Sequence, residues 1–176
     1  GLGDVYKRQP TLSLTHARTH SRTHSPPTMC QQYNESIALK KRVVELTGVV
    51  YGEVDDHFGI ALNNLAAAYW KAGRSKEALP LAKEAVEIAS KTHSERSEPY
   101  AARLTLLGLI ETELENFGEA ERILEEARLI SELVVGHHHI DYASRLNNLA
   151  SLYYKTRQFE RAMKLYRQAL DIEAAV

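Results

Sequence analysis

The sequence repeats itself every 42 residues, and this period constrains the fold more than any other feature. The segments 60–89, 102–131 and 144–173 align without a gap, and an aromatic residue recurs in phase before each of them. The matched positions are apolar or small: Leu62/Leu104/Leu146, Leu65/Leu107/Leu149, Ala66/Gly108/Ala150, Ala78/Ala120/Ala162, Ala85/Ala127/Ala169, Ile88/Ile130/Ile172 and Phe58/Tyr100/Tyr142. Self-similarity at such a period is typical of arrays in which one supersecondary unit stacks on the next.

Within each repeat, the apolar residues have the spacing of a helix hairpin. In the first full repeat, Leu62, Leu65, Ala66 and Tyr69 fall at i, i+3, i+4 and i+7, which is one stripe of an α-helix. Gly73 follows and suits the left-handed backbone at a helix end, and a second apolar stripe comes after it. One hairpin cannot bury both of its faces, so we expect stability to come from stacking on neighbours. The small residues at matched positions predict that the two helices approach closely.

The connectors between repeats carry residues that cap helix N-termini. Ser97 precedes a proline, Pro99, that suits a first helical turn, and Asp55 (or the next residue) and Asp141 occupy similar places. We predict that these three side chains accept hydrogen bonds from the first free backbone N–H groups.

The period also extends backwards from the first full repeat. Residues 30–48 are predicted to form the second helix of an earlier repeat, whose first helix would fall near residues 18–28, where Thr-His-Ser-Pro-Pro-Thr stands. We therefore expect a fragment of a larger protein, beginning on half a repeat that leaves an apolar face uncovered. The expected array occupies residues 30–176, divided into a half repeat, 30–59, and repeats 60–101, 102–143 and 144–176.

Residues 1–29 have a different character. Their Thr-His pattern is of low complexity and lacks the apolar periodicity that a core requires, so we interpret them as a disordered or artefactual leader. An organelle transit peptide is the alternative, because the stretch 5–34 contains Arg and Ser and has no acidic residue. His16, His20 and His24 would share one helix face as metal ligands, but the neighbouring prolines argue against a helix there.

Composition excludes several classes of protein. The 176 residues carry a formal net charge of −1, which gives no general attraction to nucleic acid or to an anionic membrane. No apolar run is long enough to span a bilayer. The single cysteine, Cys30, cannot form an internal disulfide, so a secreted disulfide scaffold is excluded and a cytoplasmic protein is expected.

No pattern in the chain predicts catalysis. Three consecutive histidines, His137–His139, offer metal-ligating side chains, but consecutive residues point in divergent directions and no second cluster completes a site. The carboxylate pair Glu125-Glu126 belongs to a charged, solvated helix face. The sequence has no glycine-rich phosphate loop and no nucleophile–base arrangement. We predict that the protein is not an enzyme and needs no cofactor or metal.

Particular motifs identify the repeat. Leu-Asn-Asn-Leu-Ala followed by Tyr occurs at 62–69 and 146–153, and Glu-Ala-x-Pro-Leu occurs at 77–81. Residues 136–143 resemble a Gly-x-x-His-Pro-Asp-Val-Ala connector with Ile140 in place of proline. These motifs resemble the tetratricopeptide repeat in its 42-residue form, typical of kinesin light chains. The resemblance implies an all-α, right-handed superhelical solenoid of antiparallel helix hairpins, in which the first helix of each hairpin lines a concave groove.

Helical geometry then selects the residues opposite the buried stripe as groove residues. They are Asn63, Asn64, Ala67, Trp70 and Lys71 in the first full repeat, Thr105, Leu106, Leu109, Thr112 and Glu113 in the middle one, and Asn147, Asn148, Ser151, Tyr154 and Lys155 in the third.

The groove residues predict a binding mode. Amides both donate and accept, so they suit the backbone of an extended peptide, and the resemblance implies this role for Asn64 and Asn148. Lys71 and Lys155 would pair with acidic groups of the ligand, and the alanine and leucines would form an apolar floor. The asparagines could instead bond neighbouring helices or solvent. We therefore expect a protein or peptide partner with acidic groups, and neither nucleic acid nor membrane. The alternatives are a structural, self-associating element and a regulatory module of a multidomain protein.

Overall fold

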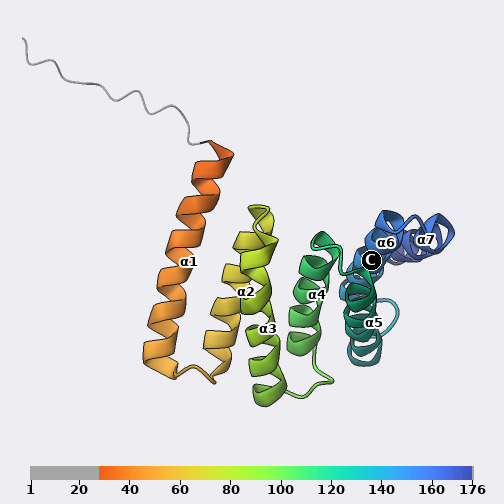
Figure 1. The fold of residues 1–176 in the computed structure, drawn as a ribbon. Coiled ribbons are helices and arrows are strands. Elements are labelled where there is room, and N and C mark those ends of the chain that lie inside the picture. Colours follow the sequence, from red (N-terminus) through yellow and green to blue (C-terminus); the bar gives the residue numbers. More distant parts are fainter. Residues whose placement is uncertain (1–27, 176) are drawn as a thin grey trace, which may run out of the picture.

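The structure is a computed structural model that describes residues 28–175. These residues form helices joined by short connectors, and there is no strand among them (Figure 1). The predicted leader, its transit-peptide alternative and His16, His20 and His24 lie outside the described residues. The helices are α1 (Met29–Tyr51), α2 (Asp56–Lys71), α3 (Ser75–Thr92), α4 (Glu98–Glu113), α5 (Phe117–Val134), α6 (Ile140–Lys155) and α7 (Phe159–Ala175).

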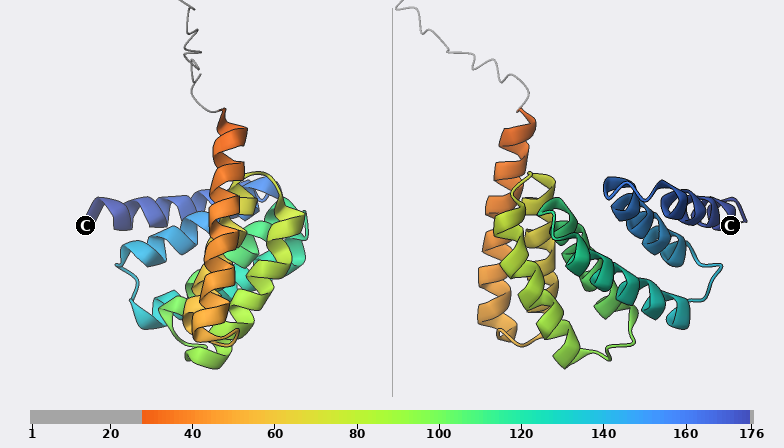
Figure 2. Two further views of the ribbon diagram at one scale, coloured as in Figure 1. Left: turned by 90° about the vertical axis from the view of Figure 1, so that its left-hand side faces the viewer. Right: turned by 45° about the vertical axis from the view of Figure 1, so that its right-hand side comes forward.

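The helices pair into hairpins that stack in chain order. α2 packs on α3, α4 on α5 and α6 on α7, while α1 packs on α2 as the predicted second helix of an earlier repeat. Successive hairpins turn relative to one another, so α7 lies across the direction of α1 (Figure 2). The prediction of an all-α solenoid is confirmed. α1 begins at Met29, with Thr28 and Gln31 forming a reciprocal capping box at its start.

The hairpin turns share one unusual backbone conformation. Gly73 has φ +73°, as predicted for a left-handed helix end. The equivalent residues of the next two repeats, Glu115 and Arg157, adopt φ +63° and +61° although each has a side chain. A left-handed residue with a Cβ atom costs about 1–2 kcal/mol. The turn geometry is therefore kept in all three repeats, and only the first uses the residue that adopts it without strain.

The predicted close approach of paired helices is clearest at Gly108. An added Cβ atom at this position would lie 2.6 Å from Leu124 Cγ across the α4–α5 interface. Its counterparts Ala66 and Ala150 are fully buried. Around these small residues, large apolar side chains such as Ile110 fill the interior of each hairpin.

Ion pairs join successive repeats at one recurring position. Arg103 on α4 pairs with Asp56 at the start of α2, and Arg145 on α6 pairs with Glu98 at the start of α4. The Arg103 side chain is buried, at 5% exposure, and that of Arg145 is nearly so, at 11%. Because the pattern recurs one period apart, charge as well as apolar packing fixes how one repeat sits on the next.

The helix caps differ in part from the prediction. Asp55 caps α2, accepting a hydrogen bond from the backbone N–H of His57 at 2.8 Å. Ser97 holds the N-cap position of α4 but makes no side-chain cap bond. The prediction for Asp141 is wrong: His139 caps α6, and its ring Nδ1 accepts from the N–H of Asp141 at 3.2 Å. His139 is the residue just before α6, the N-cap position, from which a side chain can accept from a free backbone N–H of the first turn. Asp141 is already the second residue of the helix.

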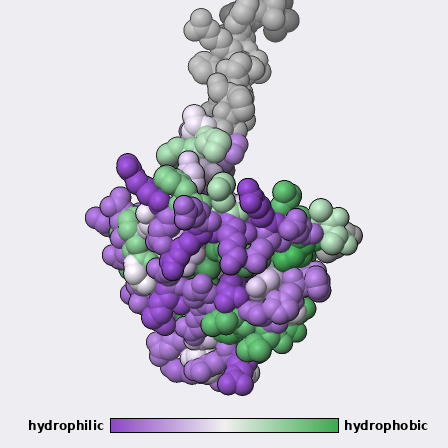
Figure 3. All heavy atoms as spheres, turned by 90° about the vertical axis from the view of Figure 1, so that its right-hand side faces the viewer, coloured by the Kyte–Doolittle hydropathy of each residue, from purple (hydrophilic) through white to green (hydrophobic). Residues whose placement is uncertain are grey.

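Both end helices expose apolar side chains. On α1 the exposed residues include Leu39, Val43, Leu46 and Val50, and on α7 they include Phe159, Met163, Tyr166 and Leu170. Figure 3 views the side of the array that carries its C-terminal end, where hydrophobic patches interrupt a largely hydrophilic surface. The expectation of an uncovered apolar face therefore holds for α1, and α7 has a similar face.

Candidate peptide-binding groove

The first helices of the hairpins form one continuous surface. α2 contacts α4 and α4 contacts α6, whereas in the described part of the chain α3 does not contact α5, nor α5 contact α7. An array whose first helices touch and whose second helices diverge curves with its first helices on the inner side. The concave side therefore consists of α2, α4 and α6, the helices that carry every predicted groove residue.

The four asparagines differ in exposure and in hydrogen bonding. Asn64 is exposed and Asn148 is half-buried, and within residues 28–175 neither side chain has a partner. Asn147 instead donates from Nδ2 to Glu173 Oε1 on α7, at 2.9 Å. Asn63 is half-buried, and its Oδ1 is buried without a hydrogen-bond partner. The second asparagine of each pair thus has a free amide, Asn63 also lacks a partner although its oxygen is buried, and the bonding alternative describes Asn147 alone.

The two predicted lysines also differ from each other. Lys71 is exposed and forms no ion pair within the part of the chain that the structure describes. Lys155 pairs with Glu113, which occupies the same position one repeat earlier. The middle repeat therefore supplies a carboxylate where its neighbours supply an ammonium group, and that carboxylate neutralises one of them.

The predicted apolar floor is only partly accessible. Ala67, Leu109 and Ser151 hold the same place in successive repeats, and all three are half-buried. Leu106 is only 8% exposed and belongs to the core cluster shared by helices α1 to α5, so it leaves little surface for a ligand.

Two other groove residues of the middle repeat turn their polar atoms inward. The hydroxyls of Thr105 and Thr112 are buried and donate at 2.8 Å to backbone carbonyls of their own helix, those of Ala101 and Gly108. They therefore do not offer these donors to a ligand.

The two predicted aromatic residues sit at opposite ends of the groove. Tyr154 is 61% exposed and packs edge-on against Phe159, with ring centroids 5.6 Å apart. Trp70 is half-buried and packs partly against the core. Trp70 also lines the wall of a cavity, described next.

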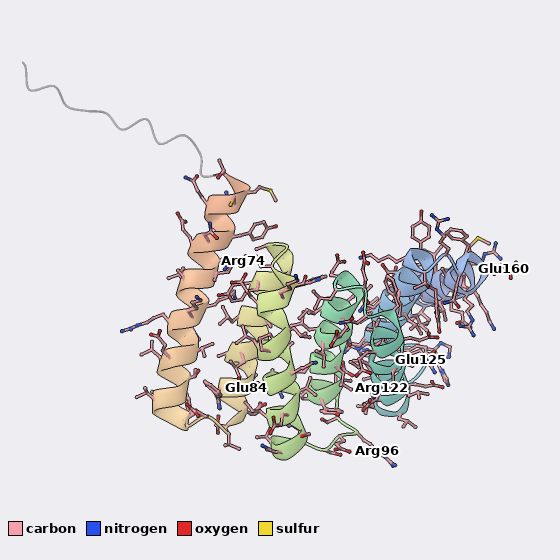
Figure 4. The ribbon with its side chains drawn as sticks, in the orientation of Figure 1. Arg74, Glu84, Arg96, Arg122, Glu125 and Glu160 are labelled. Atoms are coloured by element: carbon pink, nitrogen blue, oxygen red, sulfur yellow. The ribbon has the colours of Figure 1, made fainter. Side chains whose placement is uncertain are left out.

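A cavity of about 710 Å³ opens where α1, the α2–α3 turn and the end of α4 meet. Its walls are Tyr33, Trp70, Lys71, Gly73, Arg74, Ser75, Lys76, Glu77, Glu113 and Leu114. Figure 4 shows Arg74 at this turn, beside α1. Arg74 lies over the ring of Tyr69, 4.6 Å from its centroid, and hydrogen-bonds Glu77. That bond lowers the pKa of Glu77.

Sequence reasoning found Trp70 and Lys71 but missed Tyr33, Lys76 and Leu114. The 42-residue period could have indicated these residues, because it predicts where each helix begins and ends and they lie at or near helix ends. The sequence does not predict, however, that α1 forms one wall of the cavity beside the α2–α3 turn.

The groups considered for metal or acid–base chemistry are dispersed. His137, His138 and His139 are exposed, and His139 is engaged in capping α6. Glu125 and Glu126 bond arginines of their own helix, and Cys30 is exposed. Among residues 28–175, no three His, Cys, Asp or Glu side chains come together as metal ligands. In the same range, no helix is long and apolar enough to cross a membrane.

Comparisons with known proteins agree with this architecture. The model of the tetratricopeptide repeat family matches residues 28–91 and 100–173, and the chain belongs to that family. No curated protein sequence matches the chain. Tetratricopeptide repeats are generally non-catalytic scaffolds for protein–protein interactions.

Solved structures have the same fold. BtubC (BKLC) from P. vanneervenii superposes with a TM-score of 0.71 at 20% identity, over 82% of this chain and 57% of that one. A kinesin light chain-like protein of nearly identical TPR-like repeats from Podosopora anserina superposes with a TM-score of 0.71 at 23% identity, over 82% and 69%. The fold is thus that of the kinesin-light-chain-like repeat proteins, and this chain spans little more than half the length of BtubC.

Proposed function

We propose that the chain binds an extended, acidic segment of a partner protein along α2, α4 and α6. One observation carries the proposal: Asn64 and Asn148, at the same position of two repeats, keep amides without an internal partner. An extended peptide brings backbone donors and acceptors that lack partners of their own, and free amides satisfy both. Lys71, also without a partner, supports the preference for acidic residues.

Binding of this kind is modest in affinity, because the peptide loses conformational entropy when it is ordered. The free amides are neutral and lie on a groove open to solvent. Each peptide–amide hydrogen bond adds about 0.5–1.5 kcal/mol. Removing both amides therefore weakens binding without disturbing the core.

The test is a screen of the full chain against an array of nine-residue peptides, followed by affinity measurements on the captured peptides. The double variant Asn64→Ala/Asn148→Ala should lose about 1–3 kcal/mol of binding free energy and keep the wild-type melting temperature. Asn34→Ala, an exposed asparagine on α1, is the matched control and should bind normally. If the double variant mainly lowers the melting temperature, the asparagines are structural and the proposal fails.

Self-association is the second candidate function, and it has an observation of its own. The exposed stripes on α1 (Leu39 to Val50) and on α7 (Phe159 to Leu170) share the spacing i, i+4, i+7, i+11. A second copy could therefore stack its α1 on α7 head to tail. Sedimentation of the wild type and of Leu46→Glu decides this candidate. It predicts a concentration-dependent mass that the variant abolishes, and a wild-type mass that stays monomeric at all concentrations excludes it.

A further inference from the structure

α7 presents an apolar stripe that no other helix covers. Within the described residues, α7 contacts α6 alone, through a side that includes the buried Ala162 and Ala169. Four apolar side chains on another side of the helix are 40–64% exposed and follow one another at the spacing i, i+4, i+7, i+11. They are Phe159, Met163, Tyr166 and Leu170. This is the spacing with which one helix packs lengthwise along another.

Inside the array, the same positions receive the next hairpin. One period earlier, Glu121 and Arg128 on α5 stand where Met163 and Leu170 stand on α7. Their charged groups bond the hydroxyls of two tyrosines on α6. The stripe on α7 has apolar side chains in place of both charges, so it suits an apolar partner surface better than a helix like α6. Exposed apolar patches of this kind mark sites of protein–protein contact.

Two opposite charges flank the stripe, seven residues apart. Glu160 and Arg167 are exposed and have no ion-pair or hydrogen-bond partner among residues 28–175. Helical geometry places both on one edge of the stripe. Figure 4 shows Glu160 on α7, at the end of the array opposite α1. The equivalent positions hold two lysines on α3, and a glycine and a glutamate on α5, so of these three helices only α7 offers an acid with a base.

A second copy of α7, running in the opposite direction, matches the stripe and the charges together. Phe159 of each copy then meets Leu170 of the other, and the two central residues of the stripe meet in the same way. Glu160 lies about two residues along the axis, or about 3 Å, from the level of Arg167 of the other copy, which both side chains can span. Twofold symmetry repeats this contact, so the interface contains two ion pairs.

We propose that two copies of the chain pair through α7, antiparallel and about a twofold axis, with Glu160 of each copy bound to Arg167 of the other. This inference rests on self-association, the second candidate function, and not on peptide binding. The interface uses the same patch on both copies, so it closes at two chains and leaves α1 free. In head-to-tail stacking, by contrast, α1 of the next copy covers the stripe. One helix pair buries less than the roughly 800 Å² per partner of a standard interface, so the dimer is weak.

Sedimentation equilibrium of the full chain, over roughly 1 μM to 1 mM, tests the dimer. The wild-type mass should rise with concentration and stop at two chains. Met163→Glu puts a charge in the middle of the stripe and should keep the chain monomeric where the wild type is mainly dimeric. Leu46→Glu is the matched control on α1 and should dimerise like the wild type. Both residues are exposed, so thermal melts followed by circular dichroism should show that both variants are folded.

Charge reversal tests the antiparallel register. Glu160→Arg and Arg167→Glu should each weaken the dimer roughly 10-fold, because each removes two accessible ion pairs and leaves like charges in contact. The double variant Glu160→Arg/Arg167→Glu restores opposite charges and should dimerise like the wild type. An equimolar mixture of the two single variants should also form dimers. Glu95→Arg, which reverses an exposed acid in the α3–α4 connector, is the control and should change nothing.

Three results would overturn the proposal. A wild-type mass that stays monomeric at every concentration excludes self-association in either form. A mass that grows beyond two chains, and that Leu46→Glu abolishes, assigns the stripe to α1 of another copy and supports head-to-tail stacking. A dimer that both single charge reversals leave intact, or that the double variant fails to restore, rejects the contact between Glu160 and Arg167.

Discussion

Arg103 on α4 and Asp56 at the start of α2 form a partly buried ion pair across the boundary between two repeats. The pair has a counterpart one period later, so it belongs to the repeat and not to one local contact. Arg103→Met should cost about 2–3 kcal/mol of unfolding free energy, because it leaves the Asp56 carboxylate half-buried without its main partner. Denaturant unfolding measures the change.

The control for this substitution is Arg42→Met, which removes an exposed pair with Glu45 within α1. An exposed pair of this kind contributes less than about 0.5 kcal/mol. If the two variants lose the same free energy of unfolding, the pair between repeats stabilises the fold no more than an exposed pair does.

The same pair predicts a pH dependence. Burial by itself raises the pKa of Asp56, but hydrogen bonds from Arg103 and His93 outweigh it and hold the pKa below its ordinary value. A carboxyl whose pKa is lower in the folded state stabilises the fold above the unfolded pKa of about 3.9, and this contribution disappears as pH falls through the folded-state pKa. As the pH falls below about 4, the wild type should therefore lose more stability than Asp56→Asn. Thermal melts recorded over this pH range measure the difference. Parallel curves would contradict the assignment.

The left-handed turn residues predict stabilising substitutions. Glu115→Gly and Arg157→Gly should each raise the unfolding free energy by about 0.5–1 kcal/mol, since glycine adopts positive φ without strain and loses part of this gain to its greater freedom when unfolded. Gly73→Ala should lower it by a similar amount. Melting temperatures of the three variants decide the point, and a destabilised Arg157→Gly would show that the side chain matters more than the backbone.

Gly108 and Gly118 form a matched pair for testing helix approach. Gly108→Ala places a methyl group 2.6 Å from Leu124 Cγ and should cost about 1–3 kcal/mol through overpacking. Gly118 in the first turn of α5 has nothing within 4 Å, so Gly118→Ala should stabilise the fold by up to about 0.5 kcal/mol through helix propensity, which counts less there than in a helix interior. Denaturant unfolding measures both changes in the free energy of unfolding. If Gly108→Ala does not destabilise the fold, the close approach of α4 and α5 is refuted.

Tyr153 carries a spectroscopic prediction. Burial, together with the hydrogen bond to Glu121, raises its pKa to about 12. In an alkaline titration followed by tyrosinate absorbance, one group should ionise near pH 12, and Glu121→Gln should move it towards the ordinary value because the nearby negative charge is lost. An unchanged titration would show that this bond does not form.

The fold could be predicted from the sequence because its period repeats the same packing role at each position. Leu62, Leu104 and Leu146 are buried in their hairpins, as the alignment requires. The candidate site could be predicted only in part. The period places Lys155 and Glu113 at the same position of adjacent repeats, but it does not say that the curvature brings their side chains together. A helical wheel predicts that Leu106 faces the groove, and this prediction is only partly right, because the wheel does not show how deeply neighbouring helices cover the edge of α4.

The location of the ligand is the central claim, and crosslinking tests it most directly. A captured peptide carrying a photoreactive phenylalanine analogue at successive positions would be irradiated with the full chain, and the attachment sites read by mass spectrometry. We predict attachment on α2, α4 and α6. Attachment confined to α3, α5 and α7 would contradict the account.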